Sequence, residues 1–136
     1  YKALNHQHML EVEAFLRTLT DASFTIRFVP QSGPFVRGIF TTAFPPGVSR
    51  QELDEVYAQC YENDPLISIG SGSPDLRWIQ GTPRSHIVIA GDNTQGVAFV
   101  AIDNLGKGAA GQAIQNLNCI FGIEETTGLS LPGGFV

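Results

Sequence analysis

The stretch SHIVIAGDNTQGVAFVAI, residues 85–102, decides the fold class. Two runs rich in β-branched residues, 85–90 and 97–102, flank a polar segment bounded by glycines at 91–96. This arrangement predicts two antiparallel strands joined by a short loop. Consecutive strands with no helix between them favour an α+β fold with a mainly antiparallel sheet over a doubly wound parallel one.

Three helices are predicted around this hairpin. Apolar residues at helical spacing indicate helices at 9–19 and at about 107–121. A third helix opens after a capping box, Ser49 with Glu52, and runs to about Glu62. We expect the two earlier helices to cover one face of the sheet.

Further strands are predicted where short runs rich in β-branched, aromatic or aliphatic residues are bounded by turn residues. These runs lie at 23–29, 35–44, 66–69 and 76–80.

Composition limits the function. The 136 residues are 43% apolar and 15% charged, which is typical of a globular domain with a buried core. A net charge of −5 argues against a nucleic-acid partner, and the apolar runs are much shorter than a membrane span. Cys60 and Cys119 have no metal or redox spacing, so we expect buried, inert thiols in a reducing cytoplasm. Because the chain begins at Tyr1 and its only methionine is Met9, we expect a piece of a longer protein.

The step His6-Gln7-His8 before the first predicted helix is the first candidate for chemistry. Zinc sites take three or four protein ligands, and the only other histidine, His86, lies in a predicted strand, so a metal site is not favoured. The ordinary pKa of histidine is near neutrality, which suits general acid–base catalysis. From the residues alone, an alternative is that His6 and His8 simply flank the start of the helix and have no catalytic role.

A glycine-rich turn, Asn104–Gly111, joins the last predicted strand to the last helix. Such a turn with a lysine, here Lys107, can hold an anion on backbone N–H groups at the helix start. Its glycine spacing does not fit a P-loop, and its place late in the chain does not fit the dinucleotide-binding G-x-G-x-x-G motif. The alternative is a helix kept thin by glycine and alanine for close packing.

Two charged residues have two interpretations each. Arg37, in a predicted strand, either aims its guanidinium at an anionic substrate or is a solvated strand charge. Asp103, at a strand end, is more typical of a helix cap than of a catalytic acid.

Several of these motifs also occur together in one known family. The run DNLGKGAAGQAIQNLN at 103–118 resembles the C-terminal signature D-N-L-x-K-G-A-A-G-Q-A-x-Q-x-x-N of the N-acetyl-γ-glutamyl-phosphate reductases. Tyr1 with HQHMLEV at 6–12 is similar to the family's Y-x(4–5)-H-R-H-x-P-E-[IV], and RGIFTT at 37–42 is similar to its R-G-I-L-x-T strand. The resemblance covers essentially the whole chain in the right order.

The resemblance implies a fold like the C-terminal domain of glyceraldehyde-3-phosphate dehydrogenase. Its sheet would be mainly antiparallel or mixed and covered on one face by helices. Residues 1–104 would belong to the substrate and dimerisation domain. Residues 105–136 would form a C-terminal helix and tail that return to a dinucleotide-binding domain outside this chain. The last helix would therefore stand apart from the other helices and, in this chain alone, expose Ile114, Leu117 or Ile120. The expected assembly is a homodimer or homotetramer formed through the sheet.

The resemblance also implies an activity, the NADPH-dependent reduction of N-acetyl-glutamyl phosphate to its semialdehyde in arginine biosynthesis. A cysteine in the N-terminal domain would attack the acyl phosphate, and hydride would then reduce the thioester. His6 would be the acid–base residue, and His8, Tyr1 and Arg37 would bind the small-molecule substrate. NADP would be bound mainly by the N-terminal domain. Four residues of the glycine-rich turn would face the cofactor: Asn104, Lys107, Gly108 and Ala109.

The chain departs from the family pattern at several points. The catalytic G-C-Y-P-T cysteine is not in this chain, Gln7 replaces the family's arginine, and GTP at 81–83 replaces its G-S-N. A sister group reduces a carrier-linked aminoadipyl phosphate in lysine biosynthesis with nearly the same motifs. The alternatives are therefore that reductase, or a non-catalytic oligomerisation or regulatory module derived from the family. Without the nucleophile, the 136-residue chain alone is predicted to be inactive.

Overall fold

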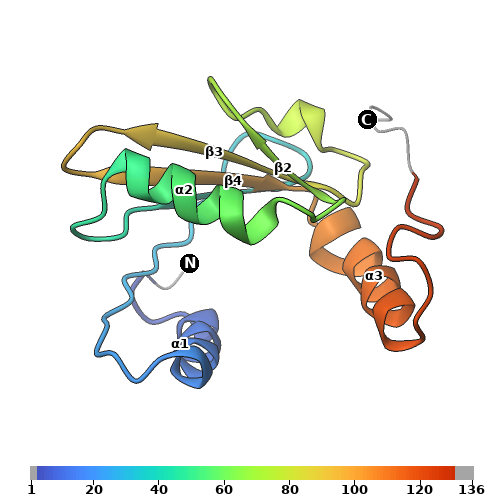
Figure 1. Ribbon diagram of the computed structural model, residues 1–136, viewed down its shortest axis with the longest axis horizontal. Helices are drawn as coiled ribbons and strands as arrows, with labels where there is room; N and C mark the ends of the chain where they lie inside the picture. The colour runs from blue at the N-terminus through green and yellow to red at the C-terminus, as the bar shows by residue number, and fades with distance from the viewer. Residues whose placement is uncertain (1–2, 131–136) are drawn as a thin grey trace. The chain divides into compact units, whose positions relative to one another are not determined.

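The computed structural model describes residues 3–130, which fall into two units, Tyr1–Phe35 and Val36–Val136. Figure 1 labels the elements of both units. None of the helices in the described part of the chain is long and apolar enough to span a membrane.

The first unit contains α1, which runs from Gln7 to Leu19. It begins two residues earlier than the apolar spacing predicts because the His6 side chain caps its first turn. The predicted strand at 23–29 is wrong. Its backbone is extended, but it has no ladder of hydrogen bonds to another strand among residues 3–130. The alternating pattern is real, since Phe24, Ile26 and Phe28 are half-buried, but a strand also needs a partner.

The second unit is built on a mixed sheet of four strands in the order β1-β4-β3-β2. Strand β4 pairs antiparallel with both β1 and β3, whereas β2 runs parallel to β3. The predicted hairpin is confirmed, with Ser85 opposite Ile102 and Gly91 opposite Gly96. The α+β class is confirmed as well. The strands are β1 (Ile39–Ala43), β2 (Ile67–Gly70), β3 (Ser85–Gly91) and β4 (Gly96–Ile102).

Helix α2, Arg50–Tyr61, covers one face of this sheet, as predicted (Figure 1). It begins with the predicted capping box of Ser49 and Glu52. Leu53 lies at the centre of the interface, and burying such a side chain stabilises the fold by roughly 1.5–3 kcal/mol. The buried residues that pack with Leu53 come from the two central strands: Ile87, Ile89 and Ala98.

The predicted strand at 76–80 is also wrong, because a short 3-10 helix, η1 (Leu76–Trp78), lies there. Asp75 accepts the backbone N–H of Arg77 at 2.9 Å and so starts a turn where the apolar run alone suggests an extended chain.

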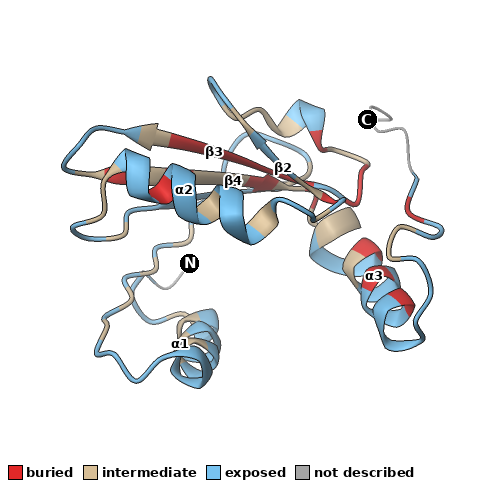
Figure 2. Ribbon diagram, in the orientation of Figure 1, coloured by how far each residue is buried: buried red, intermediate tan, exposed pale blue. Residues whose placement is uncertain are grey.

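The last helix begins with one π-helical turn, η2 (Gly106–Ala110), and continues as α3 (Gly111–Ile120). It lies beyond the end of the sheet and apart from α2, as predicted (Figure 1). The predicted exposure of its apolar residues is confirmed: Ile114, Leu117 and Ile120. Figure 2 shows that the buried residues of α3 lie along one side of the helix.

The expected burial of the two thiols is wrong, since Cys60 in α2 and Cys119 in α3 are both exposed. The inward stripe of α2 runs through Leu53, Tyr57 and Tyr61, which are four residues apart and so lie on one side of the helix. Cys60 lies near this stripe, seven residues after Leu53, but it is exposed, so helical spacing alone does not predict whether its thiol is buried.

Candidate functional site around Asp103

Asp103 directly follows β4 and has none of its surface exposed. Its Oδ1 accepts the backbone N–H groups of Leu105 at 2.8 Å and Gly106 at 2.7 Å, and its Oδ2 accepts that of Gly81 at 2.6 Å. Burial raises the pKa of Asp103, but these N–H groups and the Arg37 guanidinium outweigh burial and hold the pKa below its usual value. The carboxylate is therefore ionised and caps the turn, as its place at a strand end indicates.

Arg37 immediately precedes Gly38 and pairs with this carboxylate. Its Nε lies 2.7 Å from Oδ2 of Asp103, and the direction of the N–H makes the contact an ion pair rather than a straight hydrogen bond. Nε is buried, whereas 29% of the whole side chain is exposed. Gln80 donates from Nε2 to the Arg37 carbonyl at 2.7 Å. Arg37 is therefore an anchored cation rather than a freely solvated strand charge.

Close backbone contacts explain two glycines of the turn. A Cβ on Gly106 would lie 2.3 Å from the carbonyl oxygen of Thr82, and one on Gly111 would lie 2.8 Å from the carbonyl oxygen of Gly106. Real Cβ atoms do not approach so closely, so these contacts support the close-packing interpretation of the run. Gly108 differs, because it is exposed and its Cβ would lie 3.3 Å from the carbonyl oxygen of Asp103.

The predicted cofactor-facing residues hold the turn in place. Asn104 accepts the backbone N–H of Gly38 on Oδ1 at 2.8 Å, which joins the turn to the start of β1. Lys107 donates from Nζ to Oε1 of Gln115 in α3 at 2.6 Å. The exposed members of the predicted set are the two small residues that follow Lys107.

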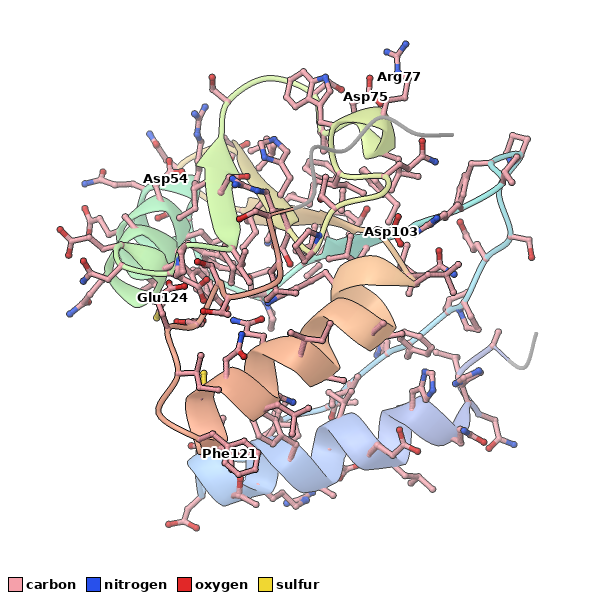
Figure 3. All side chains as sticks on the ribbon, turned by 90° about the vertical axis from the view of Figure 1, so that its right-hand side faces the viewer. Asp54, Asp75, Arg77, Asp103, Phe121 and Glu124 are labelled. Atoms are coloured by element: carbon pink, nitrogen blue, oxygen red, sulfur yellow. The ribbon has the colours of Figure 1, made fainter. Side chains whose placement is uncertain are left out.

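Helix α3 has polar residues on its buried side and large apolar residues on its exposed side. Asn118 donates from Nδ2 to the carbonyl oxygens of Glu125 at 3.0 Å and Thr127 at 2.9 Å, so it fixes the segment after the helix. Asp103 and Phe121 lie at opposite ends of this helix (Figure 3). An exposed apolar face of this kind is typical of an interaction surface. It comprises Ile114, Leu117, Ile120 and Phe121, of which the last two are more than two-thirds exposed, at 74% and 71%.

His6 and His8 lie side by side at the start of α1, with ring centroids 4.6 Å apart. His6 Nδ1 accepts the backbone N–H of His8 at 3.3 Å, so the neutral His6 ring carries its proton on Nε2. His6 is half-buried, with its ring centroid 5.4 Å from that of Phe28, and His8 is exposed. Both histidines belong to the first unit, whereas Arg37, Asn104 and the turn belong to the second. Tyr1 lies outside the described residues.

The sequence assigns His86 no function and places it only in a predicted strand, which is β3 in the structure. It is 7% exposed, and its Nδ1 lies 2.9 Å from the Ser68 hydroxyl. Its Nε2 is buried and has no hydrogen-bond partner among the described residues. Residues 3–130 also contain no group of three or more His, Cys, Asp or Glu side chains placed to hold a metal ion.

Comparison with known proteins identifies the family. Residues 1–104 match the family model described as semialdehyde dehydrogenase, dimerisation domain. The chain belongs to this family. From the motifs at 103–118 and 6–12 we expect the fold of this family. The match to the family model therefore agrees with the α+β architecture that the structure shows.

This semialdehyde dehydrogenase domain is also similar to curated reductases. The N-acetyl-gamma-glutamyl-phosphate reductase of Desulforudis audaxviator is 42% identical over 135 residues, which are 94% of this chain and 39% of the relative. The reductase of the same name from Flavobacterium johnsoniae is 38% identical over 99% of this chain and 42% of the relative. That from Methanosarcina barkeri is 40% identical over 97% and 41%. The resemblance seen in the motifs is confirmed, and the chain spans about two fifths of the length of these relatives.

Sequence reasoning about this semialdehyde dehydrogenase domain missed the pairing of Arg37 with Asp103. The two residues are far apart in the chain, and no local spacing joins them. The sequence feature that could have indicated this pairing is that Asp103 directly follows one strand, whereas Arg37 lies just before another. The antiparallel pairing of β1 with β4 places Ile39 opposite Ile102 and so brings these two ends together.

Proposed function

We propose that this chain is the substrate-side part of an NADP-dependent reductase that acts in the cytoplasm. The reaction converts N-acetyl-glutamyl phosphate to N-acetyl-glutamate semialdehyde in arginine biosynthesis. The observation that carries the proposal is 38–42% identity to three N-acetyl-gamma-glutamyl-phosphate reductases over 94–99% of the chain. Because the chain covers only about two fifths of those relatives, the nucleophilic cysteine is proposed to lie in the remainder.

In the proposed reaction, a cysteine thiolate outside this chain attacks the acyl carbon and the bond to the phosphate oxygen breaks. The products are a thioester and inorganic phosphate. NADPH, when bound, supplies the hydride that reduces the thioester. The resulting hemithioacetal oxygen takes up a proton, and collapse of the hemithioacetal releases the semialdehyde and the thiol. These steps require a proton donor and acceptor near the oxygen and the sulfur.

His6 is the proposed proton donor of this chain. Because its Nδ1 accepts the His8 backbone N–H, the ring presents Nε2–H as a hydrogen-bond donor. That tautomer can polarise a thioester carbonyl oxygen, and stabilise negative charge on the hemithioacetal oxygen, by donating a hydrogen bond. Full transfer of a proton to that oxygen uses the imidazolium form, whose Nδ1 is itself a donor and releases the cap. Accepting a proton from the thiol at Nε2 would require the proton on Nδ1 and would break the cap. The geometry therefore supports a role at the oxygen more than a role as the base toward the thiol.

His8 is proposed to bind substrate beside His6. It is the more exposed of the two histidines, and its ring lies edge-on to the His6 ring. Tyr1 and Arg37 are proposed to complete the substrate contacts. Of these, Arg37 has a partly exposed guanidinium, which suits an anionic substrate.

The residues of the glycine-rich turn fit a supporting contact with NADP. Gly108 and Ala109 are exposed and have minimal side chains, so a flat cofactor can approach the backbone there. Asn104 and Lys107 already hold Gly38 and Gln115, and their remaining N–H groups are the donors proposed to face the cofactor. The main cofactor site is proposed to lie in the remainder of the protein.

The apolar face of α3 supports the proposed division of the chain at residue 104. A helix that exposes Ile114, Leu117 and Ile120 and buries Gln115 requires a further surface to cover it. We propose that the dinucleotide-binding domain is that surface, and that the sheet forms a homodimer or homotetramer. The family's description as a dimerisation domain supports the oligomer.

The direct test is an assay of NADPH oxidation by the full-length purified protein. Turnover of N-acetyl-glutamyl phosphate, with little activity toward a carrier-linked aminoadipyl phosphate, is the expected result. The opposite preference would support the lysine-pathway reductase, and no turnover of either substrate would support a non-catalytic module. The 136-residue chain alone should be inactive, and turnover by it would point to Cys60 or Cys119 as the nucleophile.

A further inference from the structure

Asp103 joins three separate segments of the second unit at one buried point. It lies between the end of the sheet and the start of the last helix (Figure 3). Capping the turn uses Oδ1, which accepts the N–H groups of Leu105 and Gly106. Oδ2 has a different set of contacts, Gly81 and the Arg37 guanidinium. A cap alone does not require the second set, so the Arg37 contact needs its own explanation.

Within the described residues, the contact between Arg37 and Asp103 leaves Nη1 and Nη2 of the guanidinium free to bind another group. The contact with Asp103 is made by Nε, at 2.7 Å, and Nε is buried. Neither Nη1 nor Nη2 makes a hydrogen bond with residues 3–130, and 29% of the side chain is exposed. A guanidinium is planar, so an ion pair at Nε restricts the positions that the remaining N–H donors can take. Those donors form the fork that binds a carboxylate or a phosphate bidentately.

The backbone beside Arg37 is tightly constrained as well. Gly38 has a φ of 117°, and a Cβ there would lie 2.8 Å from Cδ2 of Leu76. Its N–H donates to Oδ1 of Asn104 at 2.8 Å. Arg37 is thus fixed at its side chain by Asp103 and at its backbone by Gln80 and the next residue. A surface charge that only keeps a strand soluble does not need this degree of constraint.

We propose that Asp103 is a positioning residue for substrate binding, which holds the Arg37 guanidinium by Nε so that Nη1 and Nη2 bind an anionic group of the substrate. The identity of the substrate rests on the function proposed above. That substrate carries a phosphate and a carboxylate, and each can offer two oxygen acceptors to such a fork. Asp103 itself touches no substrate, because it is completely buried.

The test uses the complete reductase in the reverse direction. Semialdehyde, NADP⁺ and inorganic phosphate are converted to acyl phosphate, NADPH and a proton. This direction separates the two anions, because phosphate is one substrate and the carboxylate is on the other. Arg37→Ala and Asp103→Asn are each expected to raise the KM for the same one of these substrates by roughly tenfold to a hundredfold, with kcat changed by less than about threefold. Unchanged KM values for both substrates would overturn the proposal.

A double-mutant cycle distinguishes positioning from general loss of structure. If Asp103 acts through Arg37, Asp103→Asn in the Arg37→Ala background should raise KM by less than about twofold further. Effects that multiply in the double mutant would overturn the proposal. Asp75→Asn is the matched control, since Asp75 holds Arg77 Nε at 2.9 Å in an exposed pair. It should leave both KM values unchanged.

Two further measurements cover the remaining outcomes. If Asp103→Asn does not fold, Arg37→Lys replaces it, because lysine keeps the charge but has no Nε to be held and no fork. A KM like that of Arg37→Ala supports the proposal, and a wild-type KM overturns it. NMR of ¹⁵N-arginine-labelled protein gives a readout that does not depend on turnover. The Arg37 Nε–H should exchange slowly with water in the wild type and rapidly in Asp103→Asn.

This NMR readout separates the inference from the proposed function. A wild-type protein with no reductase activity would reject the function. Loss of the slowly exchanging Nε–H in Asp103→Asn would still support the Arg37 contact, and an unchanged signal would overturn it.

Discussion

The two groups of residues proposed to serve the reaction are packed very differently. His6 lies in a unit in which none of the described residues is buried, and its contact with His8 is one hydrogen bond of 3.3 Å. Asp103 lies in a unit with a core, is completely buried, and contacts Arg37 and three backbone N–H groups. We therefore expect substitutions to change activity without changing stability at the first site, and to change both at the second.

The largest effect is expected at His6, and on activity alone. His6→Asn in the complete reductase should lower kcat by roughly 10²–10⁴, the usual range for general acid–base catalysis, with little change in KM. Asparagine is a favourable N-cap residue, so α1 should keep its cap. Steady-state kinetics with a melting curve as control test this prediction. A kcat near that of the wild type would show that the assignment to His6 is wrong.

His8→Asn provides the matched change two residues away. Because His8 is assigned to substrate binding, its replacement should raise KM and leave kcat nearly unchanged. A large loss of kcat in His8→Asn beside a near-normal His6→Asn would mean that the two roles are exchanged. If both variants only melt at lower temperature, the H-x-H step is structural.

The next largest effect is expected on stability at Asp103. Asp103→Ala leaves the Arg37 guanidinium and three backbone N–H groups without their acceptor. Breaking a buried ion pair from one side costs about 3–5 kcal/mol, and the partial exposure of Arg37 places the expected loss near the lower figure. Urea unfolding followed by circular dichroism measures it. A loss no greater than that of His6→Asn would remove the contrast between the two sites.

A smaller effect is expected from a matched pair of glycine substitutions in the turn. Gly106→Ala should destabilise the protein by roughly 1–3 kcal/mol, because its Cβ would lie 2.3 Å from the Thr82 carbonyl oxygen. Gly108→Ala should cost less than about 1 kcal/mol, since the nearest atom is 3.3 Å away. Thermal melting of both variants compares them. Equal losses would show that the close contact with Thr82 does not govern the turn.

The smallest effect is a pH dependence at Asp103. Its pKa is lowered in the folded protein, so its contribution to stability is complete above the ordinary aspartate pKa of about 3.9. That contribution is lost as the pH falls through the lower, folded-state pKa. The difference in unfolding free energy between the wild type and Asp103→Asn should therefore stay constant from pH 7 to about pH 4 and narrow at lower pH. Other carboxylates titrate equally in both proteins, so a difference that also stays constant below about pH 4 would contradict the assignment.

Local sequence determined the elements whose partners are adjacent in the chain. The hairpin at 85–102, the capping box of Ser49 and Glu52, and the existence of the last helix all follow from spacing over a few residues. The expected exposure of Leu117 follows instead from the family resemblance. The part of the site that depends on one turn, the H-x-H step at a helix start, was likewise visible in the sequence. Its catalytic role stays a prediction.

Only the tertiary structure decided the features that depend on distant partners. The run at 23–29 has the pattern of a strand, but no ladder partner among the described residues. The direction in which α3 faces was decided by Asn118, which binds carbonyl oxygens after the helix and turns the polar side inward. The meeting of Arg37 with Asp103 was decided by the pairing of β1 with β4. Spacing along the chain specifies which side chains share a face, whereas long-range pairing and burial specify what that face contacts.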